Sequence, residues 1–165
     1  MYHTELSRDG PGLLLRDIEK GEDPQILASL RVVGHANADT IVLADFDYDA
    51  NRVALNAFAD RLEHYPYRFA LAPNRGVQSG MDGDNDGRFG EPEDAQGYGR
   101  FSGDGGLAIL SKWPIETAAV RDFTHLNWID LEGALAPDTV SVTQHLSTTG
   151  HWIVPIKTPQ NQMLS

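Results

Sequence analysis

The chain has 165 residues, with 24 acidic against 13 basic side chains and a formal net charge of −11. A surface of that sign repels phosphate backbones, so it argues against passive nucleic-acid binding but leaves metal-dependent chemistry on phosphates open. The absence of cysteine excludes disulfides, thiolate zinc sites and cysteine nucleophiles, and the length predicts a single domain over residues 1–165.

Helical and strand patterns alternate through the first 71 residues. Apolar residues recur at helical spacing over residues 24–35, after a turn and a shorter apolar pattern near the start. Residues 39–45 are a short β-branched apolar run, typical of a buried strand that presents Asp45 at its carboxyl end. Residues 49–64 then predict a helix, and residues 67–71 predict a strand.

The pattern changes at residues 74–106, which are rich in glycine, aspartate and proline and show no sustained periodicity. A loop of that length is uncommon in a compact domain unless it has a function. Residues 106–111 return to a buried strand pattern, and residues 139–146 and 151–156 predict two further strands. The order of elements indicates a mixed α/β fold with a long insertion.

A calcium-loop pattern lies inside this insertion, at residues 82–93. Its specified positions are filled by Asp82, Asp84, Asp86, Gly87 and Glu93. Alternating carboxylates in such a loop point inward to a hard cation, and the late glutamate closes the shell. The flanking residues do not predict helices, so we expect an isolated calcium loop that orders the insertion. The alternative is a solvated acidic turn in which aspartate and glycine serve turn formation alone.

Three segments together resemble the endonuclease/exonuclease/phosphatase superfamily, the deoxyribonuclease-like metal-dependent phosphoesterases. Residues 105–115 (GGLAILSKWPI) resemble a strand and turn of that superfamily, residues 38–45 (ADTIVLAD) its strand ending in a metal-binding glutamate, and residues 2–6 (YHTEL) its opening strand. In addition, residues 4–17, 45–49 and 147–152 are similar to a bacterial branch of the superfamily.

The resemblance implies a four-layer α/β/β/α sandwich, with two packed sheets between flanking helices, and a catalytic magnesium or manganese ion at the strand ends. His3 stands where the family has asparagine, and Asp45 where it has glutamate. The candidate metal ligands are therefore Asp45 first, then Glu5 and His3, although a nitrogen ligand suits magnesium poorly. Arg100 is a candidate for holding the substrate phosphate.

The acidic segment that follows the second predicted strand carries Asp45, Asp47 and Asp49 at alternate positions. Asp47 is a further oxygen donor for the catalytic cation. The three aspartates together are either a second cation cluster or the acidic start of a helix, stabilised by the helix dipole.

The resemblance also implies a second half of the domain, with a catalytic histidine, an Asp-x-Asn strand end and a terminal Asp-His pair. The sequence shows none of these motifs, and His151 fits a structural role beside Trp152 better than the catalytic one. We therefore expect half of the sandwich, the N-terminal portion of the family domain, which lacks its C-terminal partner half and is inactive as this chain alone.

The sequence thus predicts a metal-dependent hydrolase of phosphate esters, of the phosphodiesterase, nuclease or phosphatase type, with nucleic acid as one candidate substrate. The alternative is a non-catalytic, calcium-stabilised binding module. No apolar run reaches the length of a membrane span, and the first residues do not form a signal peptide. A calcium loop favours an extracytoplasmic location, which is otherwise open.

Overall fold

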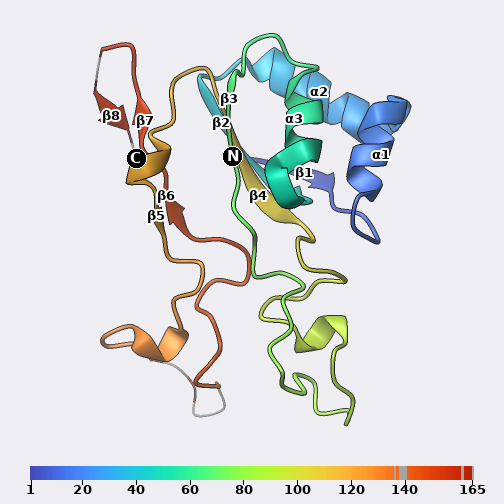
Figure 1. Cartoon of the computed structure of the whole chain (residues 1–165), viewed down its shortest axis with the longest axis vertical. Helices are drawn as coiled ribbons and strands as arrows, with labels where there is room; N and C mark the ends of the chain where they lie inside the picture. Colours follow the sequence, from blue (N-terminus) through green and yellow to red (C-terminus); the bar gives the residue numbers. More distant parts are fainter. Residues whose placement is uncertain (136, 138–140, 161, 165) are drawn as a thin grey trace.

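Helices and strands fill the first part of the chain, and long loops dominate the rest (Figure 1). The computed structural model describes residues 1–135, 137, 141–160 and 162–164. The helices are α1 (Leu13–Lys20), α2 (Pro24–Ala36) and α3 (Val53–Ala59). The strands are β1 (Tyr2–Leu6), β2 (Thr40–Phe46), β3 (Tyr67–Phe69), β4 (Gly106–Ser111), β5 (Arg121–Asp122), β6 (Trp152–Ile153), β7 (Ile156–Lys157) and β8 (Met163–Leu164).

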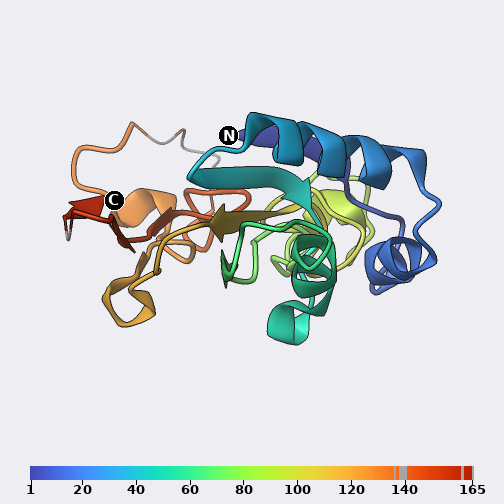
Figure 2. The same ribbon diagram turned by 90° about the horizontal axis from the view of Figure 1, so that it is seen from above.

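The four-stranded sheet is mixed, as predicted, and its strand order is β1-β2-β4-β3. β1 runs parallel to β2, and β4 runs antiparallel to β2 and β3. All three helices lie on one face of this sheet (Figures 1 and 2). Their apolar side chains share one core with sheet residues such as Leu43 and Leu110. No helix in the described part of the chain is both long and apolar enough to cross a membrane.

Helix α2 begins and ends where the sequence predicts. Asp23 caps its first turn, because the carboxylate accepts a hydrogen bond from the Ile26 amide at 2.8 Å, and Pro24 stands where no amide donor is needed. Asn37 ends the helix in the left-handed conformation that asparagine tolerates.

The helix predicted over residues 49–64 is shorter in the structure. Asn51 and Arg52 have left-handed backbone angles, φ 68° and 58°, which confine the start of this segment to a single 3-10 turn. Asp49 accepts hydrogen bonds from the amides of Val53 and Ala54, so it caps α3. Asp49 therefore acts at a helix start, the second of the two roles considered for the acidic segment.

The other face of the sheet carries a smaller core, formed by Phe69, Ile109 and Val154 with Trp152 at its edge. The rings of Phe69 and Trp152 meet edge to face, with their centroids 5.6 Å apart. A pocket of about 530 Å³, lined mainly by apolar side chains, opens on this face. The two-stranded ladders β5–β6 and β7–β8 lie on this side (Figure 1). The four-layer sandwich stays a prediction.

Two loop regions, residues 70–105 and the described residues between 123 and 151, lie together at one end of the molecule (Figure 1). Asn74 joins them. Its Nδ2 donates to the carbonyls of Thr124 and Ser147, each at 2.6 Å, and its Oδ1 lies 2.9 Å from Nδ1 of His145. The side chain is fully buried. Because these polar contacts bridge the loops, the long insertion is anchored at its first residue.

The strand predicted at residues 139–146 is not found in its described part. Residues 139 and 140 lie outside the described residues, and residues 141–146 form a turn with a single bridge, from Asn127 to His145. The strand predicted at residues 151–156 is divided between β6 and the start of β7.

Candidate active site

The carboxyl ends of β1 and β2 meet at one edge of the sheet, because the two strands are parallel. The strand pairing is irregular there: it passes from His3 opposite Ala44 to Leu6 opposite Phe46, so β1 has one extra residue. Glu5 and Asp45 have positive φ, 54° and 59°. Such bulges re-aim side chains, and left-handed angles at residues other than glycine concentrate at functional sites.

The Asp45 carboxylate contacts side chains from three other positions in the chain. Oδ1 accepts a hydrogen bond from Nη1 of Arg75 at 3.0 Å. Oδ2 lies 3.4 Å from the hydroxyl of Ser7 and 3.9 Å from Nε2 of His3. The Asp45 side chain is 15% exposed and that of His3 is 65% exposed. The carboxylate is therefore partly desolvated, with the imidazole on its open side.

Asp45 Oδ2 and His3 Nε2 are close enough to bind the same divalent cation. Two ligand atoms that each lie about 2.1 Å from a metal are at most about 4.2 Å apart, and the observed separation of 3.9 Å is within that limit. Glu5 is exposed, and in the described part of the chain no third carboxylate or imidazole lies within 4.8 Å of both ligand atoms. The structure brings two of the three candidate ligands together.

Arg75 is a site residue that the sequence reasoning missed. It comes from the first turn of the insertion, 30 positions from Asp45, and no periodic pattern marks it. The feature of the sequence that could have indicated a close contact here is the glycine at position 105, immediately before β4. A Cβ atom there would lie 2.1 Å from Nη1 of Arg75 and 2.6 Å from Oδ1 of Asp45, so only glycine leaves room for the ion pair.

Asp47 is buried beside this site and makes two backbone contacts. Its Oδ1 accepts a hydrogen bond from the Gly105 amide and its Oδ2 one from the Arg8 amide, both at 2.9 Å. The pKa of Asp47 is raised to about 6, chiefly by burial and to a lesser degree by the Asp104 carboxylate, while the hydrogen bonds from the Gly105 and Arg8 amides act to lower it. Both oxygens of Asp47, which directly follows β2, are thus engaged, one with the residue before β4 and the other with the segment after β1.

We expect the side-chain carboxyl carbon of Asp47 to titrate with a midpoint near pH 6, well above its ordinary value of 3.8. Between these two values the folded state binds a proton that the unfolded state has released. The stabilising contribution of Asp47 is therefore complete below about pH 3.8 and is lost as the pH rises to about 6. A carbon-13 NMR titration measures the midpoint, and a value at or below 4 would contradict the burial argument.

Arg100, the candidate phosphate ligand, makes its polar contacts with Asp9 and Asp104. Its guanidinium pairs with Asp9, and its backbone amide donates to Asp104 at 2.9 Å. Its side chain is 52% exposed. A role of Arg100 in substrate binding stays a prediction.

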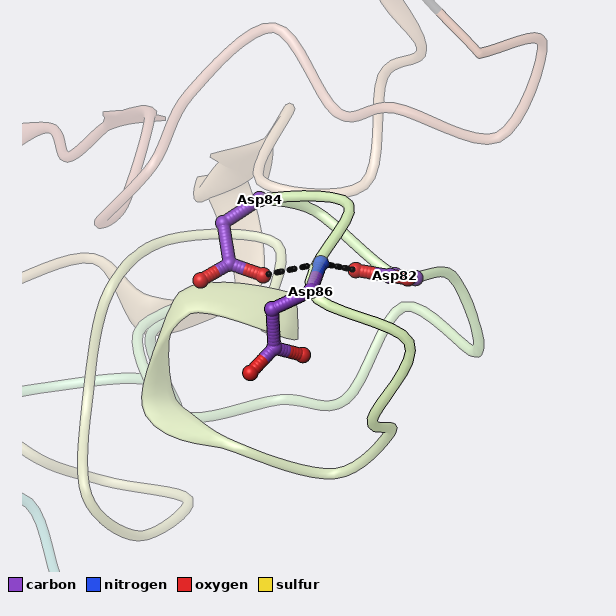
Figure 3. A group of neighbouring side chains, drawn as sticks. All are labelled: Asp82, Asp84 and Asp86. Carbon is purple, nitrogen blue, oxygen red and sulfur yellow. Dashed lines mark hydrogen bonds between the residues drawn. The ribbon is translucent and has the colours of Figure 1, made fainter.

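The acidic loop forms a separate cluster, in which Asp82, Asp84 and Asp86 place one carboxylate oxygen each within 4.8 Å of the others (Figure 3). The Asp86 amide donates to Oδ1 of Asp82 at 3.1 Å and to Oδ1 of Asp84 at 3.2 Å. Partial desolvation, followed by the charges of Asp86 and Asp82, raises the pKa of Asp84. The carboxylates therefore lie close together, at an electrostatic cost that a cation would relieve.

The end of the loop differs from the simple pattern. Glu93 is exposed and lies outside the three-aspartate group. Its neighbour Asp94 is buried and accepts hydrogen bonds from the amides of Gly83, at 2.7 Å, and Glu91, at 3.1 Å. Partial desolvation and then the charge of Asp86 raise the pKa of Glu91, so Glu91 is also close to the cluster.

Comparison with known proteins gives one match. A family model described as the Endonuclease/Exonuclease/phosphatase family matches residues 18–162. No curated protein and no solved structure matches the chain. The matched region contains Asp45, Arg75 and the acidic loop, whereas β1 with His3 precedes it.

Proposed function

Because the chain belongs to the endonuclease/exonuclease/phosphatase family, we propose that it is a metal-dependent hydrolase of phosphate esters, of the phosphodiesterase, nuclease or phosphatase type. The observation that carries this proposal is the approach of His3 Nε2 to Asp45 Oδ2, at 3.9 Å, where β1 and β2 end. A carboxylate and an imidazole at this separation supply two ligands to one cation.

The proposed roles follow from the donor set. Asp45 and His3 hold the cation, which when bound supplies charge stabilisation on the phosphoryl oxygens and an acidified water. Ser7 steadies the second oxygen of Asp45 at 3.4 Å. An imidazole beside a carboxylate favours manganese over magnesium, because magnesium prefers an all-oxygen shell. Glu5 is exposed at the bulge of β1. We propose it as a further ligand that reaches the cation after a change of its side-chain rotamer.

The surroundings of Asp45 also bear on the substrate. Asp47 and Asp104 are buried carboxylates near the site, so a phosphate ester meets net negative charge there until a cation offsets it. Substrate binding should consequently depend on the cation. Nucleic acid is one candidate within the class of phosphate esters.

The test is hydrolysis of bis-p-nitrophenyl phosphate with Mn²⁺, Mg²⁺ or Ca²⁺. The expected Asp-x-Asn strand end and terminal Asp-His pair are not recognised after β4, so the DNA that flanks the encoding segment is sequenced first, and the full protein that it encodes is assayed. We expect release of p-nitrophenolate with Mn²⁺ that is abolished by a chelator. A protein that carries these motifs, yet neither binds Mn²⁺ nor hydrolyses the ester, would refute the proposal.

The acidic loop favours a second candidate function, a non-catalytic, calcium-stabilised binding module. Its support is the three-aspartate cluster, in which carboxylate oxygens converge within 4.8 Å. Calcium accepts six to eight oxygens, and backbone carbonyls and water complete such a shell. We propose Asp82, Asp84 and Asp86 as its ligands, with Glu93 or Glu91 closing the loop. The two functions are compatible within one chain.

Calcium is expected to raise the melting temperature of the wild-type chain, and the Asp84→Ala variant should lose this rise. At a calcium concentration about ten times the dissociation constant, the stabilisation is about 1.4 kcal/mol, or roughly 4 °C for a chain of this size. Thermal unfolding with calcium and with chelator measures the shift. Glu63→Ala removes an exposed carboxylate outside the loop and should keep the full rise. A rise that survives in Asp84→Ala would refute the loop as the calcium site.

A further inference from the structure

The guanidinium of Arg75 is fixed beside Asp45 by groups from three parts of the chain. Nε donates to the Tyr98 carbonyl at 3.1 Å. Nη1 donates to the Gly105 carbonyl at 3.2 Å and to Asp45 Oδ1 at 3.0 Å. An arginine has five N–H donors, and these contacts use the one on Nε and the two on Nη1.

The second amino group of Arg75 remains available to a ligand. In the described part of the chain, its nearest charged partner is Asp104, with Nη2 and Oδ1 3.7 Å apart, which is beyond hydrogen-bond distance. The Arg75 side chain is 26% exposed. In the described part of the chain, the two N–H donors on Nη2 thus make no hydrogen bond, and the side chain that carries them is partly open to solvent.

Glycine residues allow the backbone around Arg75 to pack closely. Gly76, the next residue, has φ 73° and its amide donates to the Gly97 carbonyl at 2.9 Å. Gly105 has φ 53° and has no Cβ to displace the ion pair. A Cβ on Gly105 would meet the ion pair, and a Cβ on Gly76 would meet the Phe101 carbonyl, so Arg75 lies in a closely packed turn and is not a freely solvated surface side chain.

The charges around Arg75 suggest when its free donors are used. The single positive charge faces two carboxylates, Asp45 and Asp104, so a phosphate group meets a net negative site. If a cation shares Asp45 with His3, that charge is offset, and Arg75 becomes the nearest fixed positive charge for an oxyanion. Planar arginine forks match phosphate oxygens well.

We propose that Arg75 is the phosphate-binding residue of this site, donating from Nη2 to an oxygen of the substrate phosphate while it balances the charge of Asp45. This inference rests on the proposed function and names a subsite within it. In this subsite Arg75 acts in addition to the cation and its ligands. Arg75 is therefore expected to weaken cation binding and to strengthen phosphate binding, which are effects of opposite sign.

The Arg75→Gln variant separates these two effects without a measurement of turnover. The protein with Arg75 and the Arg75→Gln variant are compared in the Asp84→Ala background, so that the acidic loop does not contribute a metal site. Electron paramagnetic resonance of free Mn²⁺ should show roughly tenfold tighter binding in Arg75→Gln, because a neighbouring positive charge is removed. Phosphorus NMR of inorganic phosphate in the presence of Mn²⁺ should show binding weakened by about tenfold or more.

Two matched variants complete the test. Arg75→Lys keeps the charge but loses the fork, so its Mn²⁺ affinity should stay near that of wild type while its phosphate affinity falls. Arg31→Gln changes an exposed arginine on α2 and should alter neither affinity. If Arg75→Gln binds both ions more weakly, its role is structural; if its phosphate affinity is unchanged, Arg75 is not the phosphate ligand. Either result overturns the proposal.

The same titrations distinguish failure of this subsite from failure of the proposed function. Phosphate binding is repeated with a chelator in place of Mn²⁺. If Mn²⁺ does not bind at Asp45 but phosphate binding in chelator is lost in Arg75→Gln, the proposed function fails and the Arg75 subsite stands. If the encoded protein hydrolyses the ester and Arg75→Gln leaves phosphate affinity intact, the subsite fails and the function stands.

Discussion

The Asp45→Asn variant should bind Mn²⁺ about 100-fold or more weakly than the wild-type chain, since loss of a residue that merely supports a metal ligand already costs about 10- to 100-fold. The substitution removes the charge of the first candidate ligand and keeps its size. Hydrolysis of bis-p-nitrophenyl phosphate by the encoded protein should fall by about 100-fold or more, because the charge stabilisation supplied by a bound cation is lost with it. Electron paramagnetic resonance and a chromogenic assay measure the two effects.

Asparagine is the suitable replacement because position 45 has φ 59°, a left-handed angle that asparagine tolerates better than most residues. Its amide oxygen still accepts a hydrogen bond from Arg75, so the fold should be retained, which circular dichroism checks. Asp39→Asn changes the exposed aspartate just before the opposite end of β2 and should keep wild-type Mn²⁺ affinity. If Asp45→Asn binds Mn²⁺ normally in the Asp84→Ala background, the cation is not held at the strand ends.

Much of the sheet and its helical cover could be predicted because the signals are local. The apolar spacing of residues 24–35 and the Asp23 cap define α2, and the β-branched run of residues 39–45 defines β2. The place of Asp45 at the carboxyl end of a strand was predicted from the end of that run, and the structure confirms it. The family model confirms the resemblance on which the metal-dependent class depends.

The rest of the site depends on long-range packing that local patterns do not encode. Arg75 reaches Asp45 across 30 positions, through a loop whose path is set by hydrogen bonds from Asn74 to residues 124 and 147. The bulge at Glu5 leaves this side chain exposed rather than beside Asp45, and a bulge is a property of strand pairing, not of one segment. The left-handed angle at Arg52, which shortens the third helix, has no signal in the residue type.

The Gly76→Ala variant should lose about 2–4 kcal/mol of unfolding free energy, the sum of a positive-φ penalty and an overpacking penalty. Gly76 has φ 73°, and a Cβ atom on it would lie 1.8 Å from the carbonyl oxygen of Phe101 and 2.3 Å from the carbonyl carbon. Both are backbone atoms, so no side-chain rotation relieves the clash. Urea unfolding, followed by tryptophan fluorescence, measures the change.

Gly34→Ala is the matched control, because the same chemical change at this position should have the opposite sign. Gly34 lies in α2, is exposed, and a Cβ atom there meets nothing within 4 Å, so alanine should stabilise the helix by about 0.5–1 kcal/mol. If Gly76→Ala were as stable as wild type, the start of the insertion would not pack against Phe101 and Ser102 near its end. The neighbouring Arg75 would then not be held beside Asp45 by these contacts, and the geometric basis of its phosphate-binding role would be lost.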